Sequence, residues 1–454
     1  MTTDLRELVD ALPAGAVLTD PDVIERYRQD WARDPEAGNP LAVIRAGSTG
    51  DVQAVLRFAS AHSVPVVPRG AGSSLSGGST AVQGGLVLSL ERMRDVTIDK
   101  DMRVAVAQPG ALNAEVKQAA ALHGLWYPPD PSSFEMCTIG GNVATNAGGL
   151  CCVKYGVTTD YVLGLNVVLA DGTSVRLGGP RIKDVAGLSL TKLFVGSEGT
   201  LGVITEVTLR LLPAQAPVST MVGMFDSAER AADAVVSIMA KVRPAALELM
   251  DGVSINAVED LVSMGLDRSA DALLLARSDA PGSAAALEIE AMSAACRQHG
   301  ASEVFTTADP DEGEAFAAAR RATFPALEKL GDLLLEDVGV PIPRLPALMA
   351  GVEKIAAARE LTIALVAHAG DGNTHPAIVF DQRSTEQSAR ARLAFDDIMN
   401  LAIELGGTIT GEHGVGRLKK AWLPAQLGPE AFALNKLIKN ALDPAGILNP
   451  GAVL

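Results

Sequence analysis

Hydrophobic positions change their spacing along the chain, and the change divides the chain into regions. Residues 1–35 read as a helix or two and end in the polar tract 34–40. From residue 41 to about 213, short apolar runs such as 86–88 and 104–106 alternate with glycine-rich turns. Residues 165–177 predict a hairpin around Asp171-Gly172. We therefore expect an N-terminal helical segment over 1–35 and a β-rich domain over 36–213.

A different pattern begins after Pro213. Strand-like runs at 218–224, 246–250 and 272–276 alternate with long amphipathic segments at 228–241 and 283–299. Further helices are predicted over 312–330 and 429–442. This alternation is typical of an α+β domain in which helices cover a sheet, and we assign residues 214–454 to it.

Composition and charge narrow the classes of function. The chain has 454 residues, of which 48% are hydrophobic, and its net charge is −16. An acidic surface repels phosphate backbones and anionic lipid, which argues against nucleic-acid binding and polybasic membrane anchoring. The four cysteines form no redox or zinc pattern, and no apolar run approaches the ~18 residues of a membrane span. A cytoplasmic protein is expected.

Three tracts of small residues occur within the β-rich domain. The first, 68–78, follows a predicted strand at 64–67; the second covers 131–149 and the third 196–202. None matches the glycine motif of nicotinamide-binding or ATP-hydrolysing proteins, and a bulged turn would explain the first tract equally well. Three tracts together favour a large ligand with a diphosphate and a flat ring system.

The histidines of the C-terminal half form the strongest chemical signal. A predicted strand over 361–367 leads to His368, a tight Gly-Asp-Gly-Asn turn follows, and His375 begins the next strand. Glu412 and His413 lie between glycines further along. Two histidines and one carboxylate are the usual ligands of a catalytic Zn²⁺, Mn²⁺ or Fe²⁺ ion. Arg320 and Arg321 could bind a substrate carboxylate or simply belong to a solvated helix face.

From about Pro40 to its end, the chain resembles the FAD-linked 2-hydroxyacid dehydrogenases of the vanillyl-alcohol-oxidase flavoprotein superfamily. The motifs that carry the resemblance are TIGGNVATNAGG, GSEGTLGVITEVTL, HAGDGNTH, GEHGVG and DPAGILNPG. The family's fold implies an FAD-binding domain of two subdomains, followed by an α+β substrate cap with an antiparallel sheet. A C-terminal tail that returns to the FAD domain is part of this expectation.

The resemblance also implies roles for individual residues. The FAD-binding residues would be Arg69, Gly70, Ala71, Gly72, Ser73, Ser74, Gly77, Gly78, Pro131, Ser132, Thr138, Gly140, Gly141, Asn142, Gly148, Glu198, Gly199, Ile204 and Asn449. Ser73 and Ser74 stand where relatives with covalent flavin carry a histidine, so we expect non-covalent FAD. A divalent metal, with Zn²⁺ favoured over Mn²⁺ or Fe²⁺, would be bound by His368, His375 and Glu412. His413 would take the hydroxyl proton, and Arg320 or Arg321 would orient the substrate carboxylate.

The expected activity is oxidation of a small D-2-hydroxy acid, such as D-lactate or glycolate, to the 2-oxo acid. In the hydroxyglutarate branch a lysine that binds the second carboxylate precedes the segment matching 336–341, whereas Leu335 or a near neighbour stands there in this chain, which argues against a dicarboxylate. Three alternatives to this activity are those of a flavin-dependent alkyl transferase, a flavin-free metal hydrolase and a non-catalytic flavin subunit. The histidines and the glycine tracts argue against all three.

Electrons must pass to an external acceptor, because the chain has no iron–sulfur cysteine pattern. A quinone, a cytochrome, an electron-transfer flavoprotein, an iron–sulfur subunit and oxygen all remain open as acceptors. A homodimer and peripheral membrane association through a partner are left open as well.

Overall fold

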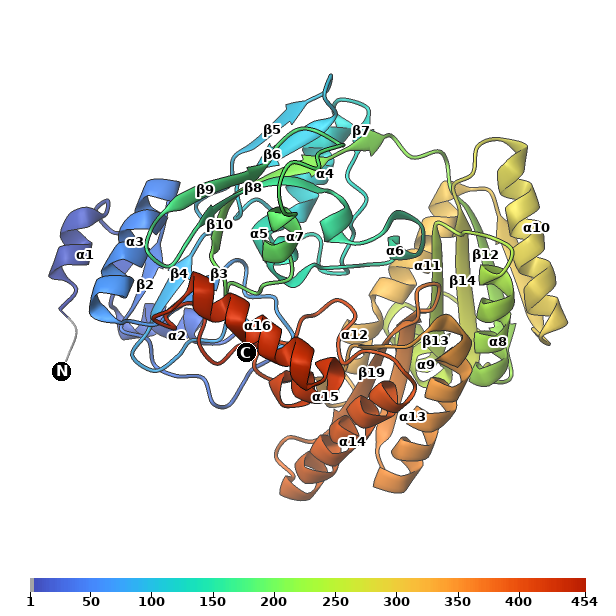
Figure 1. Ribbon diagram of the computed structural model, residues 1–454. Coiled ribbons are helices and arrows are strands. Elements are labelled where there is room, and N and C mark those ends of the chain that lie inside the picture. Colours follow the sequence, from blue (N-terminus) through green and yellow to red (C-terminus); the bar gives the residue numbers. More distant parts are fainter. Residues whose placement is uncertain (1–3) are drawn as a thin grey trace. The chain divides into compact units, whose positions relative to one another are not determined.

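The computed structural model describes residues 4–454, which form two compact units (Figure 1). The first unit contains the residues up to 148, residues 157–214 and residues 412–454. The second unit contains residues 149–156 and 215–411. The chain therefore leaves the first unit at 149 and returns to it at 157. It leaves again after 214 and returns at 412.

The first unit begins with a small mixed sheet in the order β1-β2-β4-β3, in which β2, β4 and β3 are parallel. Ser48 caps the helix that follows β2 by accepting a hydrogen bond from the Asp51 amide, and the helix buries Val55, Leu56 and Phe58. The elements are α1 (Arg6–Ala11), β1 (Val17–Leu18), α2 (Pro21–Arg28), β2 (Ala42–Arg45), α3 (Thr49–His62), β3 (Val66–Arg69) and β4 (Leu86–Ser89).

A second, antiparallel sheet of the first unit has the order β5-β6-β10-β8-β9. The predicted hairpin is confirmed, since Leu165 of β8 pairs with Leu177 of β9. The strands are β5 (Val96–Asp99), β6 (Val104–Ala107), β8 (Val162–Val168), β9 (Ser174–Gly178) and β10 (Val203–Arg210), with β7 (Leu125–Trp126) and β11 (Leu212–Pro213) forming a separate pair. The two sheets correspond to the two subdomains that the resemblance implies.

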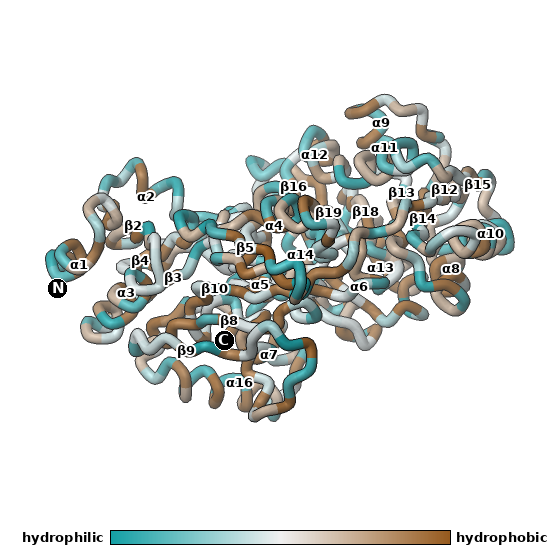
Figure 2. The backbone as a smooth tube through the Cα atoms, turned by 90° about the horizontal axis from the view of Figure 1, so that it is seen from above, coloured by the Kyte–Doolittle hydropathy of each residue, from teal (hydrophilic) through white to brown (hydrophobic). Residues whose placement is uncertain are grey.

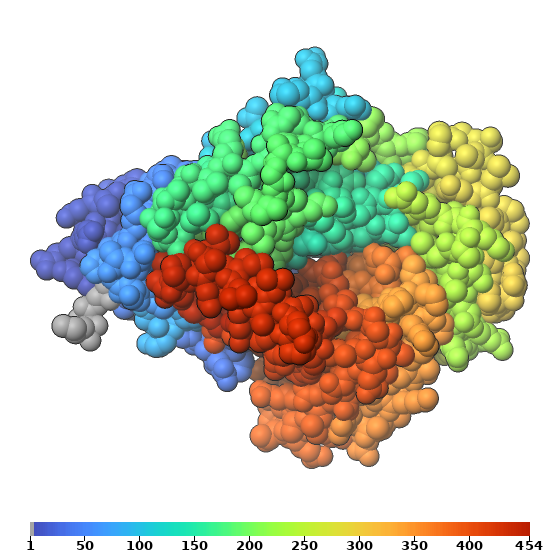
Figure 3. All heavy atoms as spheres, viewed as in Figure 1, coloured from blue at the N-terminus to red at the C-terminus, as the bar shows by residue number. Residues whose placement is uncertain are grey.

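The remaining helices of the first unit are short except for α16. They are α4 (Asn113–Ala121), α5 (Ile139–Thr145), α7 (Leu190–Phe194), α15 (Leu423–Leu427) and α16 (Pro429–Leu442), with 3₁₀ turns at Thr158–Asp160 and Lys420–Trp422. Helix α16 lies on the surface (Figure 3), and none of its residues is fully buried. It begins and ends as the sequence predicts.

The second unit is built on one antiparallel sheet in the order β15-β12-β14-β13-β18-β19-β16, with β17 also paired to β19. This confirms the predicted antiparallel sheet of the cap. Its strands are β12 (Ser219–Phe225), β13 (Ala246–Asp251), β14 (Ala272–Ser278), β15 (Glu303–Thr307), β16 (Asp332–Leu335), β17 (Val338–Gly339), β18 (Thr362–His368) and β19 (Asn373–Phe380).

Helices cover both faces of this sheet (Figure 1). Val222, Met250, Leu275 and Val366 point to one face and form an apolar core with α9, α11 and α12. Hydrophobic and hydrophilic residues alternate along the surface helices, as α10 shows in Figure 2. The helices are α6 (Cys152–Tyr155), α8 (Ala228–Met239), α9 (Gly252–Val262), α10 (Ser283–Gln298), α11 (Pro310–Arg321), α12 (Thr323–Leu327), α13 (Leu345–Arg359) and α14 (Thr385–Glu404), with a 3₁₀ turn at Ile342–Arg344.

The single helix predicted over 312–330 is wrong, because the structure has two helices, α11 and α12, that meet at Ala322. Pro325 explains the break. A proline within a helix lacks the amide hydrogen and clashes with the carbonyl four residues earlier, here that of Arg321. The Thr323 hydroxyl also bonds the Arg320 carbonyl at 2.8 Å, which closes the end of α11.

Residues 149–156 interrupt the first unit and pack in the second. Lys154 and Tyr155, at the end of α6, both contact the carboxylate of Asp279, which also accepts a hydrogen bond from Gln215 at 2.8 Å. Asp279 thus connects two separate chain segments to the strand β14. Burial alone would raise the pKa of Asp279, but the hydrogen bonds from these donors outweigh it and lower the pKa.

Candidate active site

The three small-residue tracts come together in the first unit. A Cβ atom on Gly70, in the first tract, would lie 2.2 Å from the hydroxyl oxygen of Thr138, in the second. The Glu198 amide, in the third tract, donates to the Ala144 carbonyl of the second at 2.8 Å. Glycine at position 70 is therefore required by the close approach of two tracts that lie far apart in the sequence.

Asn449, close to the C-terminus, joins the first and third tracts. Its side-chain nitrogen donates to the carbonyl of Gly78 at 2.8 Å and to that of Glu198 at 2.7 Å. The tail of the chain thereby closes the region that the tracts form. Asn449 is predicted to bind FAD; its side-chain amide makes these two contacts with the backbone of the tracts.

The side chain of Glu198 fixes the segment that carries His413. Its two carboxylate oxygens accept hydrogen bonds from the amides of Val415 (2.7 Å) and Gly416 (2.8 Å). Gly414, between them and His413, has φ +89°, and a Cβ atom there would lie 2.9 Å from the carboxyl group. Burial raises the pKa of Glu198 to about 7, against the lowering effect of the two amides.

His413 itself is anchored through its backbone. The Ser76 hydroxyl, in the first tract, donates to the His413 carbonyl at 3.1 Å. The imidazole Nε2 lies 3.6 Å from a carboxylate oxygen of Glu412, and the His413 side chain is 15% exposed. The backbone is therefore held by the flavin-binding tracts, while the imidazole keeps partial access.

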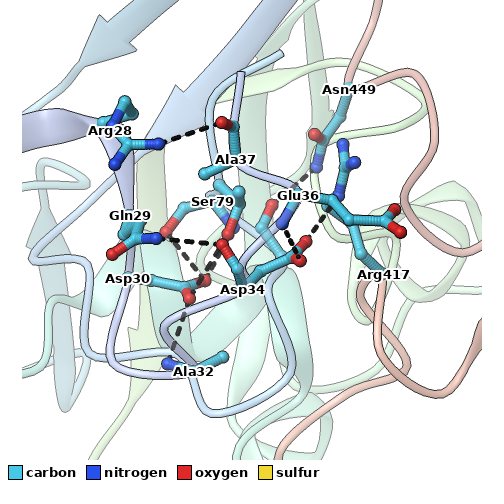
Figure 4. Close-up of polar contacts among 12 residues, drawn as sticks. Arg28, Gln29, Asp30, Ala32, Asp34, Glu36, Ala37, Ser79, Arg417 and Asn449 are labelled. Atoms are coloured by element: carbon cyan, nitrogen blue, oxygen red, sulfur yellow. Dashed lines mark hydrogen bonds and ion pairs between the residues drawn. The ribbon is translucent and has the colours of Figure 1, made fainter. Parts of the chain in front are cut away.

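A buried polar network supports the first tract from behind (Figure 4). Asp30 accepts hydrogen bonds from the amides of Ser79 (3.2 Å) and Ala32 (3.1 Å), and Asp34 pairs with Arg417 at 2.9 Å. Burial raises the pKa of Asp30. The network ties the N-terminal segment, the first tract and the segment after His413 into one structure.

Arg69 begins the first tract and lies inside it. Its guanidinium is 3.5 Å from the Ser79 carbonyl and 5.8 Å from the centre of the Tyr27 ring. Gly72 adopts φ +74°, and a Cβ atom there would lie 2.0 Å from the guanidinium. Desolvation lowers the pKa of this arginine, although a guanidinium stays charged.

These features suit FAD. The region combines closely packed glycines, serine and threonine hydroxyls, and one buried arginine, which together match the needs of a diphosphate and a flat ring. The predicted residues Thr138, Asn142, Glu198 and Asn449 are buried there, as is Ile204 on β10. The remaining predicted residues lie in the same three tracts of the first unit, at Ala71, Ser73, Ser74, Gly77, Pro131, Ser132, Gly140, Gly141, Gly148 and Gly199.

The second unit holds the predicted pair of metal-binding histidines. His368 ends β18 and His375 lies near the start of β19, and the register pairs His368 with Asn373 and Val366 with His375. The two histidines are thus diagonal neighbours on one face of the sheet. Their ring centroids are 5.1 Å apart, and both residues are buried.

Each imidazole faces a buried carboxylate through Nδ1. His368 Nδ1 lies 2.9 Å from both oxygens of Glu248, and His375 Nδ1 lies 3.9 Å from an oxygen of Asp337. For His368, the hydrogen-bonded carboxylate at Nδ1 favours the tautomer with its proton there and leaves Nε2 as a metal ligand. The donor set of this pair therefore fits a divalent metal of the zinc type.

The two candidate arginines differ in environment. Arg320 is buried on the inner side of α11, where its Nε lies 3.1 Å from Glu248. Its Nη2 atom has no hydrogen-bond partner within residues 4–454. Arg321 is paired with Glu314 instead and is 29% exposed. Only Arg320 shares its surroundings with the histidine pair.

Glu412 and His413 belong to the first unit, whereas Gly411, directly before them, belongs to the second. The Asp337 carboxylate accepts hydrogen bonds from the Gly411 amide (3.1 Å) and the Thr410 hydroxyl (2.6 Å). The carboxylate that faces His375 therefore also fixes the segment that leads to Glu412.

Sequence reasoning missed Glu248, Asp337 and Asp30. Glu248 lies in an apolar strand, 120 residues before its histidine partner, and no local motif marks it. The only available signal was the charge itself, because a carboxylate between Leu247 and Leu249 in a buried strand requires a partner.

Two family models match the chain: "FAD binding domain" over residues 40–178 and "FAD linked oxidases, C-terminal domain" over 214–453. The glycolate oxidase subunit GlcD of Bacillus subtilis (strain 168) is 43% identical over 91% of this chain and 88% of that protein. A D-lactate dehydrogenase of Archaeoglobus fulgidus is 35% identical over 92% of this chain and 93% of that protein.

Solved structures share the fold at low sequence identity. p-Cresol methylhydroxylase with substrate bound aligns with TM-score 0.82 and 16% identity, over 99% of this chain and 96% of that one. An alkyldihydroxyacetonephosphate synthase aligns with TM-score 0.76 and 18% identity, over 98% and 85%. No helix within residues 4–454 combines the length and the hydropathy that crossing a bilayer would need.

The two matched family models cover both units, and the matches to the relatives extend over almost the full length of each protein. The first unit carries the three small-residue tracts, and the second carries a buried cluster of histidine, carboxylate and arginine side chains. The chain belongs to the FAD-linked oxidases and is an FAD-binding oxidoreductase, as its motifs predict.

Proposed function

We propose that the protein is an FAD-dependent dehydrogenase that oxidises a small D-2-hydroxy acid, of the D-lactate or glycolate type, to the 2-oxo acid. The observation that carries the proposal is the buried cluster in the second unit, where two neighbouring histidines, one of them bonded to a carboxylate, accompany one buried arginine. The relatives' names, glycolate oxidase subunit and D-lactate dehydrogenase, support the same class of substrate.

In this proposal His368 and His375 bind a divalent metal through Nε2, and Glu412 completes the ligand set. Zn²⁺ is the favoured ion, with Mn²⁺ or Fe²⁺ as alternatives. When bound, such an ion lowers the pKa of a substrate hydroxyl and helps to orient the hydroxy acid. Glu248 holds the imidazole of His368 in the tautomer that this role requires.

Arg320 binds the substrate carboxylate. A guanidinium recognises a carboxylate through two parallel N–H donors, and burial strengthens the contact. The Nη2 of Arg320 has no hydrogen-bond partner within residues 4–454, and Glu248 balances the charge of the guanidinium from its Nε side. Arg321, engaged by Glu314, is not needed for this step.

His413 accepts the hydroxyl proton as the C2–H bond breaks. An imidazole with a pKa near the working pH is suited to this transfer. Its backbone is held by Ser76, and the next residues are held by Glu198, so the ring starts from a fixed main chain. FAD, which we propose would bind non-covalently, would supply the acceptor for the hydride of C2, and an external acceptor would be needed to take up the two electrons.

Leu335 favours a monocarboxylate over a D-2-hydroxyglutarate-type substrate. Its strand, β16, pairs Leu335 with Ala377, and Leu335 packs against the apolar core of the second unit. The alkyl transferase alternative shares the fold, but it does not account for a histidine pair with carboxylates at both Nδ1 atoms.

The visible absorption spectrum, recorded anaerobically during addition of substrate, tests the proposal. The purified protein is expected to show flavin bands that bleach with D-lactate or glycolate and persist with L-lactate. Bleaching by L-lactate alone, or only by D-2-hydroxyglutarate, would contradict the proposed substrate class.

A further inference from the structure

Glu248 contacts two side chains that have separate roles in the proposed function: His368, a metal ligand, and Arg320, which binds the substrate carboxylate. Both of its oxygens are 2.9 Å from His368 Nδ1, and Oε2 is also 3.1 Å from Arg320 Nε. We infer that Glu248 is a positioning residue that orients the metal ligand and the carboxylate-binding arginine together. The inference rests on the proposed function and deepens it.

The sheet explains why this one residue reaches both groups. Strand β13 pairs with β18 so that Leu249 lies opposite Ala367. The same register, continued by one residue, sets Glu248 opposite His368, with both side chains on one face. Met250 and Val366, two residues away on each strand, point into the apolar core that α11 covers, and α11 carries Arg320.

For His368, Glu248 determines the tautomer. The glutamate side chain is 1% exposed and that of His368 is 2% exposed, so water cannot replace the carboxylate. Its contact with Nδ1 keeps the proton there, and Nε2 is left with its lone pair.

For Arg320, Glu248 provides the balancing charge. A guanidinium that is 2% exposed would be an unpaired buried cation without it. Because the ion pair engages Nε, the Nη2 edge remains for a substrate carboxylate. The two charges cancel, so the arrangement adds little net charge beside the metal ligand.

Substitutions of Glu248 and Arg320 are expected to differ in their effects on Zn²⁺ affinity and on the KM for D-lactate. Glu248→Gln is expected to lower the affinity for Zn²⁺ by about 10- to 100-fold and to raise the KM for D-lactate. Arg320→Gln is expected to raise the KM by about 10²-fold, while Zn²⁺ affinity changes less than about threefold, since His368 keeps its carboxylate. A role in folding alone would move neither quantity in this selective way.

The experiment measures Zn²⁺ affinity by chelator competition, kcat and KM for D-lactate, and FAD content, in the full-length FAD-loaded protein. Glu259→Gln is the matched control. Glu259 is also nearly buried in the second unit, but it bonds the backbone amides of residues 264–266. This control is expected to change stability without changing Zn²⁺ affinity.

A double variant and an NMR measurement test the role of Glu248 even if Glu248→Gln does not fold. If Glu248→Gln fails to fold, the double variant with Arg320→Gln removes the unpaired cation and is expected to keep the weakened Zn²⁺ affinity. Nitrogen-15 NMR of the metal-free protein reads the tautomer directly, with the Nδ1–H form of His368 expected in the wild type and lost in Glu248→Gln.

Wild-type Zn²⁺ affinity together with an unchanged tautomer in Glu248→Gln would overturn the inference. Failure of the proposed function has another signature: a wild-type protein that binds no Zn²⁺ and reduces its flavin regardless. In that case the NMR result still decides whether Glu248 orients His368.

Discussion

The two units build their candidate ligand sites from different kinds of groups. The first unit brings together backbone and small side chains from three distant tracts, and its charged residues, Asp30, Asp34 and Glu198, bond amides or arginine behind them. The second unit places the charged side chains themselves in its buried core, where Glu248 contacts His368 and Arg320. The first unit thus offers a ligand mainly the shape of its backbone, whereas the second offers a few charged side chains.

This difference predicts how each unit responds to substitution. Single side chains of the second unit should control chemistry with little effect on FAD content. In the first unit, changes should act mainly on the placement of a loop or on stability.

The largest effect is expected for His368→Ala. Loss of one metal ligand should abolish metal binding and lower the rate of flavin reduction by about 10³-fold or more, because the hydroxyl pKa is no longer lowered. FAD content, read from the absorption spectrum, should not change. His62→Ala, at an exposed histidine paired with Glu7 in the first unit, is the control that should retain full activity.

Arg320→Gln should lower kcat/KM by about 10²- to 10³-fold, mostly through KM, because truncating a buried charge partner is costly. Steady-state kinetics with D-lactate measure the effect. Arg321→Gln should change kcat/KM less than about threefold, since Arg321 is bound to Glu314. Equal losses in the two variants would contradict the assignment of the carboxylate to Arg320.

His413→Ala should slow flavin reduction by about 10²-fold and retain both FAD and metal. Stopped-flow absorbance under anaerobic conditions reports the step directly. His299, which bonds Ser237 at 2.7 Å in the second unit, provides the matched alanine control. An unchanged rate in His413→Ala would remove this residue from the proton transfer.

The last prediction concerns stability and its dependence on pH through Glu198. Burial raises its folded-state pKa from the ordinary 4.5 to about 7, so between these values the folded protein binds a proton that the unfolded chain has released. Its contribution to the free energy of unfolding is therefore greatest at low pH and falls as pH rises through that window, by up to about 3 kcal/mol. Glu198→Gln should remove this part of the slope in denaturant titrations at pH 5 and 7.5.

The sequence was most informative where function depends on local motifs. The glycine tracts, the two histidines around a tight turn and the final helix all lie where the pattern predicts. Arg320 and Arg321 are equivalent in the sequence, and only burial distinguishes them.

Contacts between distant strands could not be predicted. Glu248 meets His368 through the pairing of β13 with β18, and Asp337 meets His375 beside β19; neither carboxylate lies in a motif. The break between α11 and α12 was predictable in principle, because Pro325 lies inside the region read as one helix.

The most direct test of the account is flavin reduction by D-lactate in a single turnover, with and without metal. The protein is stripped with a chelator, its FAD content is checked, and absorbance is followed anaerobically before and after Zn²⁺ is restored. The account predicts that the stripped protein keeps its flavin bands on addition of D-lactate and that they bleach once Zn²⁺ returns. Full-rate bleaching in a protein proved free of metal would contradict the role assigned to the histidine pair.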